Sequence, residues 1–309
     1  MIFPPGGSAR WGLALYRINV ITLPKFLVRN NITNTDDVNP GAAMTDICLQ
    51  LENLTLGYDG HPAVHHLSVD IARGTLTAVV GANGSGKSTL MKAIAGILKP
   101  IGGGCSVRCK RLAYLPQQSE LDRSFPARVV DLVSLGFWQR RGLLGRITAQ
   151  DRADLARCLA AVGLTGCEKR PLDSLSGGQM QRALFARAML QDADLILLDE
   201  PFNAVDGRTV DDLLVLVKRW VVEGRTVLCV LHDHDLVRAH VPQTMLLARE
   251  LVAFGPTLDV LTPDNLQQAR RFQEAWDDEA EWCAPEDDAQ RQEPGRPAES
   301  GDEKGRAYA

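Results

Sequence analysis

The feature that most constrains this chain is a glycine-rich loop between a buried strand and a helix. The sequence Gly81-Ala82-Asn83-Gly84-Ser85-Gly86-Lys87-Ser88-Thr89 follows the apolar run Leu76–Val80 and precedes residues with helical spacing. Such glycines let backbone N–H groups surround phosphate oxygens, and the positive end of the helix dipole adds to the attraction. We predict a nucleotide-phosphate loop, with Lys87 at the β- and γ-phosphates and the Ser88 hydroxyl on Mg²⁺. A glycine-rich turn with an incidental lysine is the alternative, and the strand–loop–helix context argues against it.

Two kinds of apolar pattern predict the rest of the fold. Alternating apolar residues over Leu49–Leu56 and Leu67–Ile71 predict half-buried antiparallel strands. Short continuous apolar runs predict parallel strands that are buried on both faces, at 76–80, 112–115, 195–198 and 227–231. Helical spacing separates these runs, so we predict an α/β P-loop NTPase with an antiparallel β subdomain. The helical, Arg- and Leu-rich stretch Ser119–Leu175 lacks a strand-like run, which predicts an inserted helical subdomain over about 119–178.

An acidic pair supplies the partner that a phosphate loop needs. Asp199 and Glu200 directly follow the run 195–198, at the carboxyl end of a predicted parallel strand, where sites on such sheets form. Asp199 is predicted to hold Mg²⁺. Neighbouring strand residues point to opposite sides, so Glu200 is predicted to polarise the attacking water as a general base. A pair of solvated acids is the simpler alternative, which the upstream phosphate loop disfavours.

A third motif lies between these two. Leu175-Ser176-Gly177-Gly178-Gln179 precedes a helical pattern, where Ser176 alone could be a simple helix cap. In this order, the three motifs make the chain from about Leu49 to Phe272 resemble the ATP-binding cassette (ABC) ATPase family, whose signature is LSGGQ. The resemblance implies a C2 homodimer in which Ser176, Gly177, Gly178 and Gln179 bind the γ-phosphate of ATP held by the partner's phosphate loop.

The same resemblance assigns further roles. Gln117, in Tyr114-Leu115-Pro116-Gln117, matches the family glutamine that touches Mg²⁺ and water, and Gln118 is a weaker candidate for that role. Tyr58 matches the aromatic residue that stacks on adenine, and Ala204-Val205-Asp206 matches the D-loop. For the histidine that contacts the γ-phosphate there are two candidates, His232 and His234. His232 is favoured because it directly follows the strand run.

The cargo is suggested by the segment after Gln117. Ser124-Phe125-Pro126, followed by Val129, Asp131, Leu132, Val133 and Gly136, resembles ATPases of zinc, manganese and iron importers. A generic amphipathic helix is the alternative. The resemblance implies a divalent metal importer that acts with a membrane permease and an extracytoplasmic substrate-binding protein. An importer of iron chelates, haem or cobalamin is the second hypothesis. A soluble ABC protein of DNA repair or translation is the third, disfavoured by the single cassette and its short motif spacing.

The bulk composition gives no sign of a membrane span, because no run of 18 apolar residues occurs. The resemblance to importer ATPases implies a peripheral subunit at the cytoplasmic face of the inner membrane. A net charge of −4 gives no reason to expect nucleic-acid binding. Seven scattered cysteines imply no disulfide framework.

The two ends of the chain differ from its centre. From Gln273 to Ala309, twelve acidic and four basic side chains give a net charge of −8, which predicts a disordered tail. We expect residues 1–43 to be a poorly ordered extension and hypothesise that Met44 is the start of translation. The ATPase domain is therefore expected over 44–272.

Overall fold

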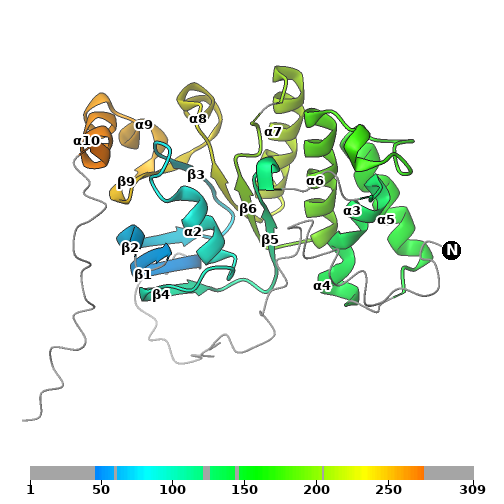
Figure 1. Ribbon diagram of the computed structural model, residues 1–309, viewed down its shortest axis with the longest axis horizontal. Helices are drawn as coiled ribbons and strands as arrows, with labels where there is room; N and C mark the ends of the chain where they lie inside the picture. The colour runs from blue at the N-terminus through cyan, green and yellow to red at the C-terminus, as the bar shows by residue number, and fades with distance from the viewer. Residues whose placement is uncertain (1–45, 59–60, 121–125, 143–145, 204, 275–309) are drawn as a thin grey trace, which may run out of the picture.

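The computed structural model describes residues 46–58, 61–120, 126–142, 146–203 and 205–274 (Figure 1). The predicted extension 1–43 and nearly all of the predicted tail lie outside the described residues, as do Ser124, Phe125 and Ala204. Within the described part, no helix has both the length and the apolar character needed to cross a membrane.

A six-stranded sheet forms the centre of the molecule, with the order β5-β6-β7-β3-β8-β9. Neighbouring strands are parallel except β8 and β9, which are antiparallel. Every residue of the three central strands β6, β7 and β3 is buried, as continuous apolar runs predict. The strands are β3 (Leu76–Val80), β5 (Leu112–Leu115), β6 (Leu195–Asp199), β7 (Thr226–Val230), β8 (Gln243–Ala248) and β9 (Glu250–Pro256).

A separate antiparallel sheet has the order β2-β1-β4, with β1 at Ile47–Tyr58, β2 at His61–Ala72 and β4 at Gly102–Val107. The first two strands agree with the alternating pattern, whereas β4 is not apparent from the sequence. Its residue Gly103 has a φ of 70°, and a Cβ there would collide with the backbone of Asn53. The pairing of β1 with β4 is irregular at this point, so the glycine is needed where the two strands approach closely.

The helices fall into two groups. One group covers the central sheet and its end: α2 (Lys87–Ile94), α7 (Gly207–Val222), α8 (His234–His240), α9 (Thr257–Val260) and α10 (Pro263–Glu274). The other lies to one side of the sheet, away from β1, β2 and β4 (Figure 1). It comprises α3 (Val129–Ser134), η3 (Leu135–Phe137), α4 (Trp138–Arg141), α5 (Ala149–Ala161), η4 (Leu172–Ser174) and α6 (Gly177–Gln191). The short helix η2 (Gln118–Glu120) follows β5, and Glu120 forms an ion pair with Lys92 of α2.

Two apolar cores hold these parts together. Alternate residues of β3 serve different cores: Ala78 and Val80 face the one shared with α3, α5 and α6. Val79 faces the other, which contains α2 and the antiparallel sheet. The strand is therefore covered on both faces, which explains why all of its residues except Thr77 are apolar. Leu90 and Ile94 of α2 are buried, whereas Ile97 lies beyond the end of this helix and is 47% exposed.

One pair of cysteines departs from the expectation of no disulfide. Cys48 in β1 and Cys109, which follows β4, form a disulfide with a Cα–Cα distance of 6.0 Å. The neighbouring strands β1 and β4 bring the two residues together although they are 61 positions apart. The spacing of Cys48 and Cys109 along the chain does not indicate that they are close. Their proximity depends on the strand β4, which the sequence did not predict.

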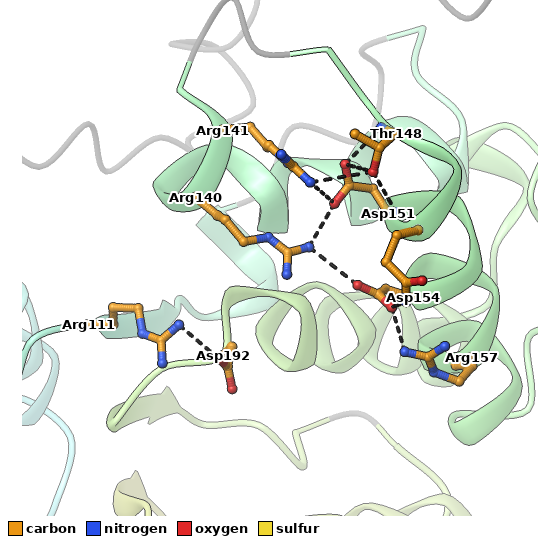
Figure 2. A network of polar contacts seen from close by, with 9 residues as sticks. Arg111, Arg140, Arg141, Thr148, Asp151, Asp154, Arg157 and Asp192 are labelled. Atoms are coloured by element: carbon orange, nitrogen blue, oxygen red, sulfur yellow. Dashed lines mark hydrogen bonds and ion pairs between the residues drawn. The ribbon is translucent and has the colours of Figure 1, made fainter.

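A buried carboxylate organises the beginning of α5 (Figure 2). Asp151 is fully buried and accepts hydrogen bonds from Arg140 Nη2 at 2.9 Å, Arg141 Nη2 at 3.0 Å and the Thr148 backbone N at 2.8 Å. Burial alone would raise the pKa of Asp151, but the bonds from Thr148 and Arg141 dominate and lower this pKa to about 2. The carboxylate thus joins α4 to the N-terminal cap of α5.

Asp151→Asn is expected to lower the free energy of unfolding by roughly 2 kcal/mol at pH 7, because two charge-assisted bonds to a buried group are lost. Since the folded pKa is depressed, this contribution is present above a pH of about 4 and is lost as the pH falls through about 2. Urea unfolding at several pH values measures the difference. The exposed Asp211→Asn serves as the control, and an equal effect of both variants would contradict the assignment.

Candidate nucleotide-binding and catalytic site

The glycine-rich loop connects β3 to α2, as the sequence predicts. Gly86 has a φ of 91°, and a Cβ on it would collide with Ala63 and Val64 of β2. A Cβ on Gly81 would collide with the Leu247 carbonyl oxygen of β8. These positions allow only glycine, so the neighbouring strands force the loop to curl closely over the end of the sheet. Backbone N–H groups at the start of α2 are thereby available to an anion.

Lys87 lies inside this loop. Its side chain is 5% exposed, and Nζ donates to the carbonyl oxygens of Gly81 at 2.9 Å and Ala82 at 2.7 Å. Burial lowers the pKa of Lys87, although the nearby carboxylates of Glu200 and Asp199 act in the opposite direction. A partly desolvated cation inside such a loop is suited to bind phosphate oxygens.

The oxygen ligands for a metal ion meet at the end of β6. Ser88 Oγ donates to Asp199 Oδ1 at 3.2 Å, and the Tyr114 hydroxyl donates to Asp199 Oδ2 at 3.4 Å. Asp199 is fully buried, and burial together with the charge of Glu200 raises its pKa to about 6. A hydroxyl and one carboxylate fit Mg²⁺, which keeps several waters and binds substrate phosphates. In the described part of the chain no cluster of three or more His, Cys, Asp or Glu residues forms a metal cage.

Glu200 directly follows β6 in a left-handed backbone conformation, with a φ of 50°. Its carboxylate has three side-chain partners. His232 Nε2 lies 2.7 Å from Oε1, Asn203 Nδ2 donates to Oε2 at 2.7 Å, and Gln117 Nε2 also donates to Oε2. Glu200 therefore does not continue the strand, and its side chain contacts Gln117 and His232, which follow β5 and β7. Sites often retain such conformations when a side chain must point in one direction.

The two candidate histidines occupy different environments. His232 contacts Glu200, whereas His234 is the first residue of α8, which Asp233 caps by accepting from the backbone N–H groups of Asp235 and Leu236. Burial lowers the pKa of His234. The geometry thus favours His232 at the site, in agreement with the preference from the sequence.

Asn203 is a site residue that sequence reasoning did not identify. Its backbone N–H donates to the Glu200 carbonyl oxygen at 3.2 Å, and its side chain reaches the carboxylate of the same residue. The available signal was an Asn three positions after an acidic residue, a spacing at which a tight turn brings side chains together.

The signature segment begins α6. Ser176 caps this helix by accepting from the backbone N–H of Gln179 at 3.2 Å, and the Gln179 side chain accepts from the Ser176 N–H at 3.2 Å. The reciprocal bonds form a capping box that fixes the first turn. The Gln179 side chain therefore turns back onto its own helix, so the N–H groups of Gly177 and Gly178 are the natural donors to an anion. The helix lies apart from α2 and the phosphate loop (Figure 1).

The two remaining predicted contacts lie at the edges of the site. Tyr58 is the last residue of β1 and is 48% exposed, so its ring has a free face on which a base can stack. Asp206 of the D-loop caps α7, accepting from the Thr209 backbone N at 3.0 Å and from the Thr209 hydroxyl at 2.9 Å.

Comparison with known protein families supports this arrangement. The family model described as ABC transporter matches residues 64–203, which include the phosphate loop, the signature and the acidic pair. A probable metal transport system ATP-binding protein of Chlamydia pneumoniae is 38% identical over 226 residues, which cover 71% of this chain and 87% of that protein. The manganese transport system ATP-binding protein MntB of Bacillus subtilis is 37% identical (71% and 91% covered). The zinc transport system ATP-binding protein TroB of Treponema pallidum is 36% identical (73% and 87% covered).

Solved structures agree with the fold. An inward-facing metal-chelate type ABC transporter matches with a TM-score of 0.67 at 33% identity, covering 73% of this chain and 90% of that one. The ADP conformation of an ATP-binding cassette has a TM-score of 0.64 at 21% identity, covering 74% and 99%, and shows the fold alone. Because its curated relatives exceed 35% identity over nearly their whole length, the chain belongs to the ATP-binding subunits of the ABC transporter family.

Proposed function

We propose that this protein hydrolyses ATP as the motor subunit of an importer for a divalent metal ion, zinc or manganese. ATP binding and hydrolysis are the activity of the family. The observation that carries the choice of cargo is that relatives sharing 36–38% of their residues with this chain are named for manganese, zinc or metal transport. The segment around Pro126, Val129 and Asp131 supports the same class.

On the phosphate side, we assign ATP to the loop Gly81–Thr89. The γ-phosphate would draw Lys87 Nζ from the carbonyl oxygens of Gly81 and Ala82, which now hold it. Ser88, Asp199 and Gln117 would hold Mg²⁺, which neutralises charge on the β- and γ-phosphate oxygens. Tyr58 would stack on the adenine ring.

On the water side, Glu200 is assigned as the general base. Its carboxylate accepts hydrogen bonds from Gln117 and Asn203 and lies against His232, so its orientation is set before a substrate arrives. Gln117 and His232 would turn to the nucleotide when it binds, with His232 at the γ-phosphate. Asn203 is three residues from Glu200 in one turn and stays beside it.

Asn203→Ala is expected to lower kcat about tenfold while the affinity for ATP changes less than twofold. The variant removes one hydrogen bond that orients the general base, worth about 1.5 kcal/mol when the acceptor is charged. Steady-state ATPase assays and equilibrium binding of a fluorescent ATP analogue measure the two quantities. A changed affinity with an unchanged kcat would contradict this role.

The complete site requires a second copy. We propose a head-to-tail homodimer in which Ser176, Gly177, Gly178 and Gln179 of one subunit close over the ATP of the other. The capping box presents the amides of this segment at a helix N-terminus, which is a second anion site. Each subunit therefore supplies half of two sites.

The proposed assembly contains two further components. A separate membrane permease would dock beside the helical subdomain, over about 119–178, which places this ATPase domain (44–272) at the cytoplasmic face of the inner membrane. An extracytoplasmic protein would deliver the metal to the permease. No nucleic-acid partner is proposed.

An importer of iron chelates is the second candidate function. It is favoured by the match to a metal-chelate type transporter at 33% identity. The two candidates share the same ATP chemistry and differ only in the permease and cargo, so residues of this site cannot separate them.

Uptake measurements distinguish the divalent metal importer from the iron-chelate importer. A strain that lacks this gene is expected to lose high-affinity uptake of radioactive zinc or manganese and to regain it with the wild-type gene but not with Glu200→Gln. Loss of ferric-chelate uptake alone would support the second candidate and overturn the first. Normal uptake of all three would overturn the import function.

A further inference from the structure

Two adjacent glutamines after β5 contact two different functional segments. Gln117 Nε2 donates to the Glu200 carboxylate. Gln118 Nε2 instead donates to the Gly177 carbonyl oxygen at 3.2 Å and to Gln181 Oε1 at 2.6 Å. Gly177 begins α6 within the signature, and Gln181 lies one turn further along this helix. One short turn therefore contacts both the catalytic carboxylate and the signature helix.

The turn itself is attached to the phosphate-binding side. Its 3₁₀ geometry is closed by the Glu120 N–H, which donates to the Gln117 carbonyl oxygen at 3.1 Å. The Glu120 carboxylate accepts from Lys92 Nζ at 2.7 Å, and Lys92 belongs to α2, which begins at the phosphate loop. The partly buried ion pair holds residues 117–120 in a fixed position relative to α2.

The far end of the contact is buried. Gln181 is 1% exposed, and within the described part of the chain its amide makes no hydrogen bond besides the one with Gln118. Water has no access to replace the donor, so removing Gln118 Nε2 would leave the Gln181 oxygen unpaired. The hydrogen bond between Gln118 and Gln181 is therefore one that water cannot replace.

We propose that Gln118 is a positioning residue that fixes the first turn of α6 relative to the turn 117–120 and so orients the signature amides for the partner's ATP. The inference rests on the head-to-tail dimer of the proposed function. The subunit's own phosphate loop does not need the signature to bind ATP, whereas closure of the dimer does. Gln118 therefore acts on closure and not on the first binding step.

The test uses Gln118→Met in the full-length Glu200→Gln protein, which retains ATP. Methionine keeps the size of the side chain and removes the amide donor. Sedimentation velocity with MgATP is expected to show a dimer dissociation constant raised about tenfold, because both copies of the link are lost. Affinity of the monomer for mant-ATP, measured at low protein concentration, is expected to change less than twofold.

Gln139→Met is the matched control. Gln139 Nε2 also bridges the helical region to β5, donating to the Leu112 carbonyl oxygen at 2.7 Å, yet it contacts neither motif. This control is expected to dimerise like the parent. Equal dimerisation of Gln118→Met and the parent would overturn the inference, as would a parallel loss of mant-ATP binding. A Glu200→Gln parent that stays monomeric would overturn the dimer itself and, with it, this inference.

Discussion

Glu200→Gln is expected to reduce steady-state ATP hydrolysis by roughly 10²–10⁴-fold, the usual contribution of a general base, while ATP remains bound. The amide keeps the shape of the side chain but cannot accept a proton from the attacking water. The loop Gly81–Thr89, Lys87, Ser88 and Asp199 are unchanged, so binding of the phosphates is preserved. Phosphate release and retention of radioactive ATP after gel filtration measure the two effects.

In the proposed head-to-tail dimer the γ-phosphate joins the two subunits, and hydrolysis would release it. The same variant is therefore expected to accumulate as a stable dimer with MgATP. Glu52→Gln, on an exposed position of β1, is the control and should hydrolyse ATP at the wild-type rate. A Glu200→Gln protein with normal turnover would contradict the assignment of Glu200 as base. If the variant loses both ATP binding and ATP hydrolysis, Glu200 instead supports the fold of the site.

Much of the central sheet could be predicted from the sequence because strands that are buried on both faces appear as short continuous apolar runs. The runs at 76–80 and 112–115 coincide with β3 and β5, and the runs at 195–198 and 227–231 match β6 and β7 to within one residue at either end. Such strands are mostly apolar on both faces, with few polar residues such as Thr77, so they stand out from the polar sequence around them. The alternating residues over Leu49–Leu56 and Leu67–Ile71 fall within β1 and β2, although the first half of β2, from His61, lies outside the predicted stretch.

The unpredicted strands lack these signals. Three consecutive glycines in β4 are typical of a turn, and of the three only Gly103 is required by a close approach to β1. The apolar stretch of β8 resembles a buried helix segment as much as a strand, since periodicity does not separate the two over so few residues. The disulfide between Cys48 and Cys109 depends on β4 and was missed with it.

The site shows the same division between local and tertiary information. Motif spacing predicts Lys87, Asp199, Glu200 and the signature as site candidates, because each lies at the end of a strand or the start of a helix that the local sequence pattern indicates. Which partners surround Glu200 is a tertiary property: Asn203 reaches it only because the backbone turns sharply after β6. Likewise, the position of Gln117 directly after Pro116 favours it over Gln118 as the family glutamine, but only the fold shows that the two side chains diverge to Glu200 and Gly177.

Lys87→Ala is expected to weaken ATP binding by about 100-fold and so to reduce hydrolysis at cellular ATP concentrations. The variant removes a partly desolvated cation from the place of the β- and γ-phosphates, where a charge-assisted contact is worth about 3 kcal/mol. It also removes the two hydrogen bonds to Gly81 and Ala82 that now close the loop. Equilibrium binding of a fluorescent ATP analogue measures the loss.

The fold should tolerate this substitution, because burial already disfavours the charged amine and its removal ends that cost. The free energy of unfolding without nucleotide is therefore expected to change by less than about 1 kcal/mol, whereas the stabilisation by added MgATP should nearly vanish. Lys218→Ala, at an exposed position of α7, is the control and is expected to keep both the free energy of unfolding and the stabilisation by MgATP. An equal loss of stability with and without nucleotide would show that Lys87 holds the loop rather than the phosphates.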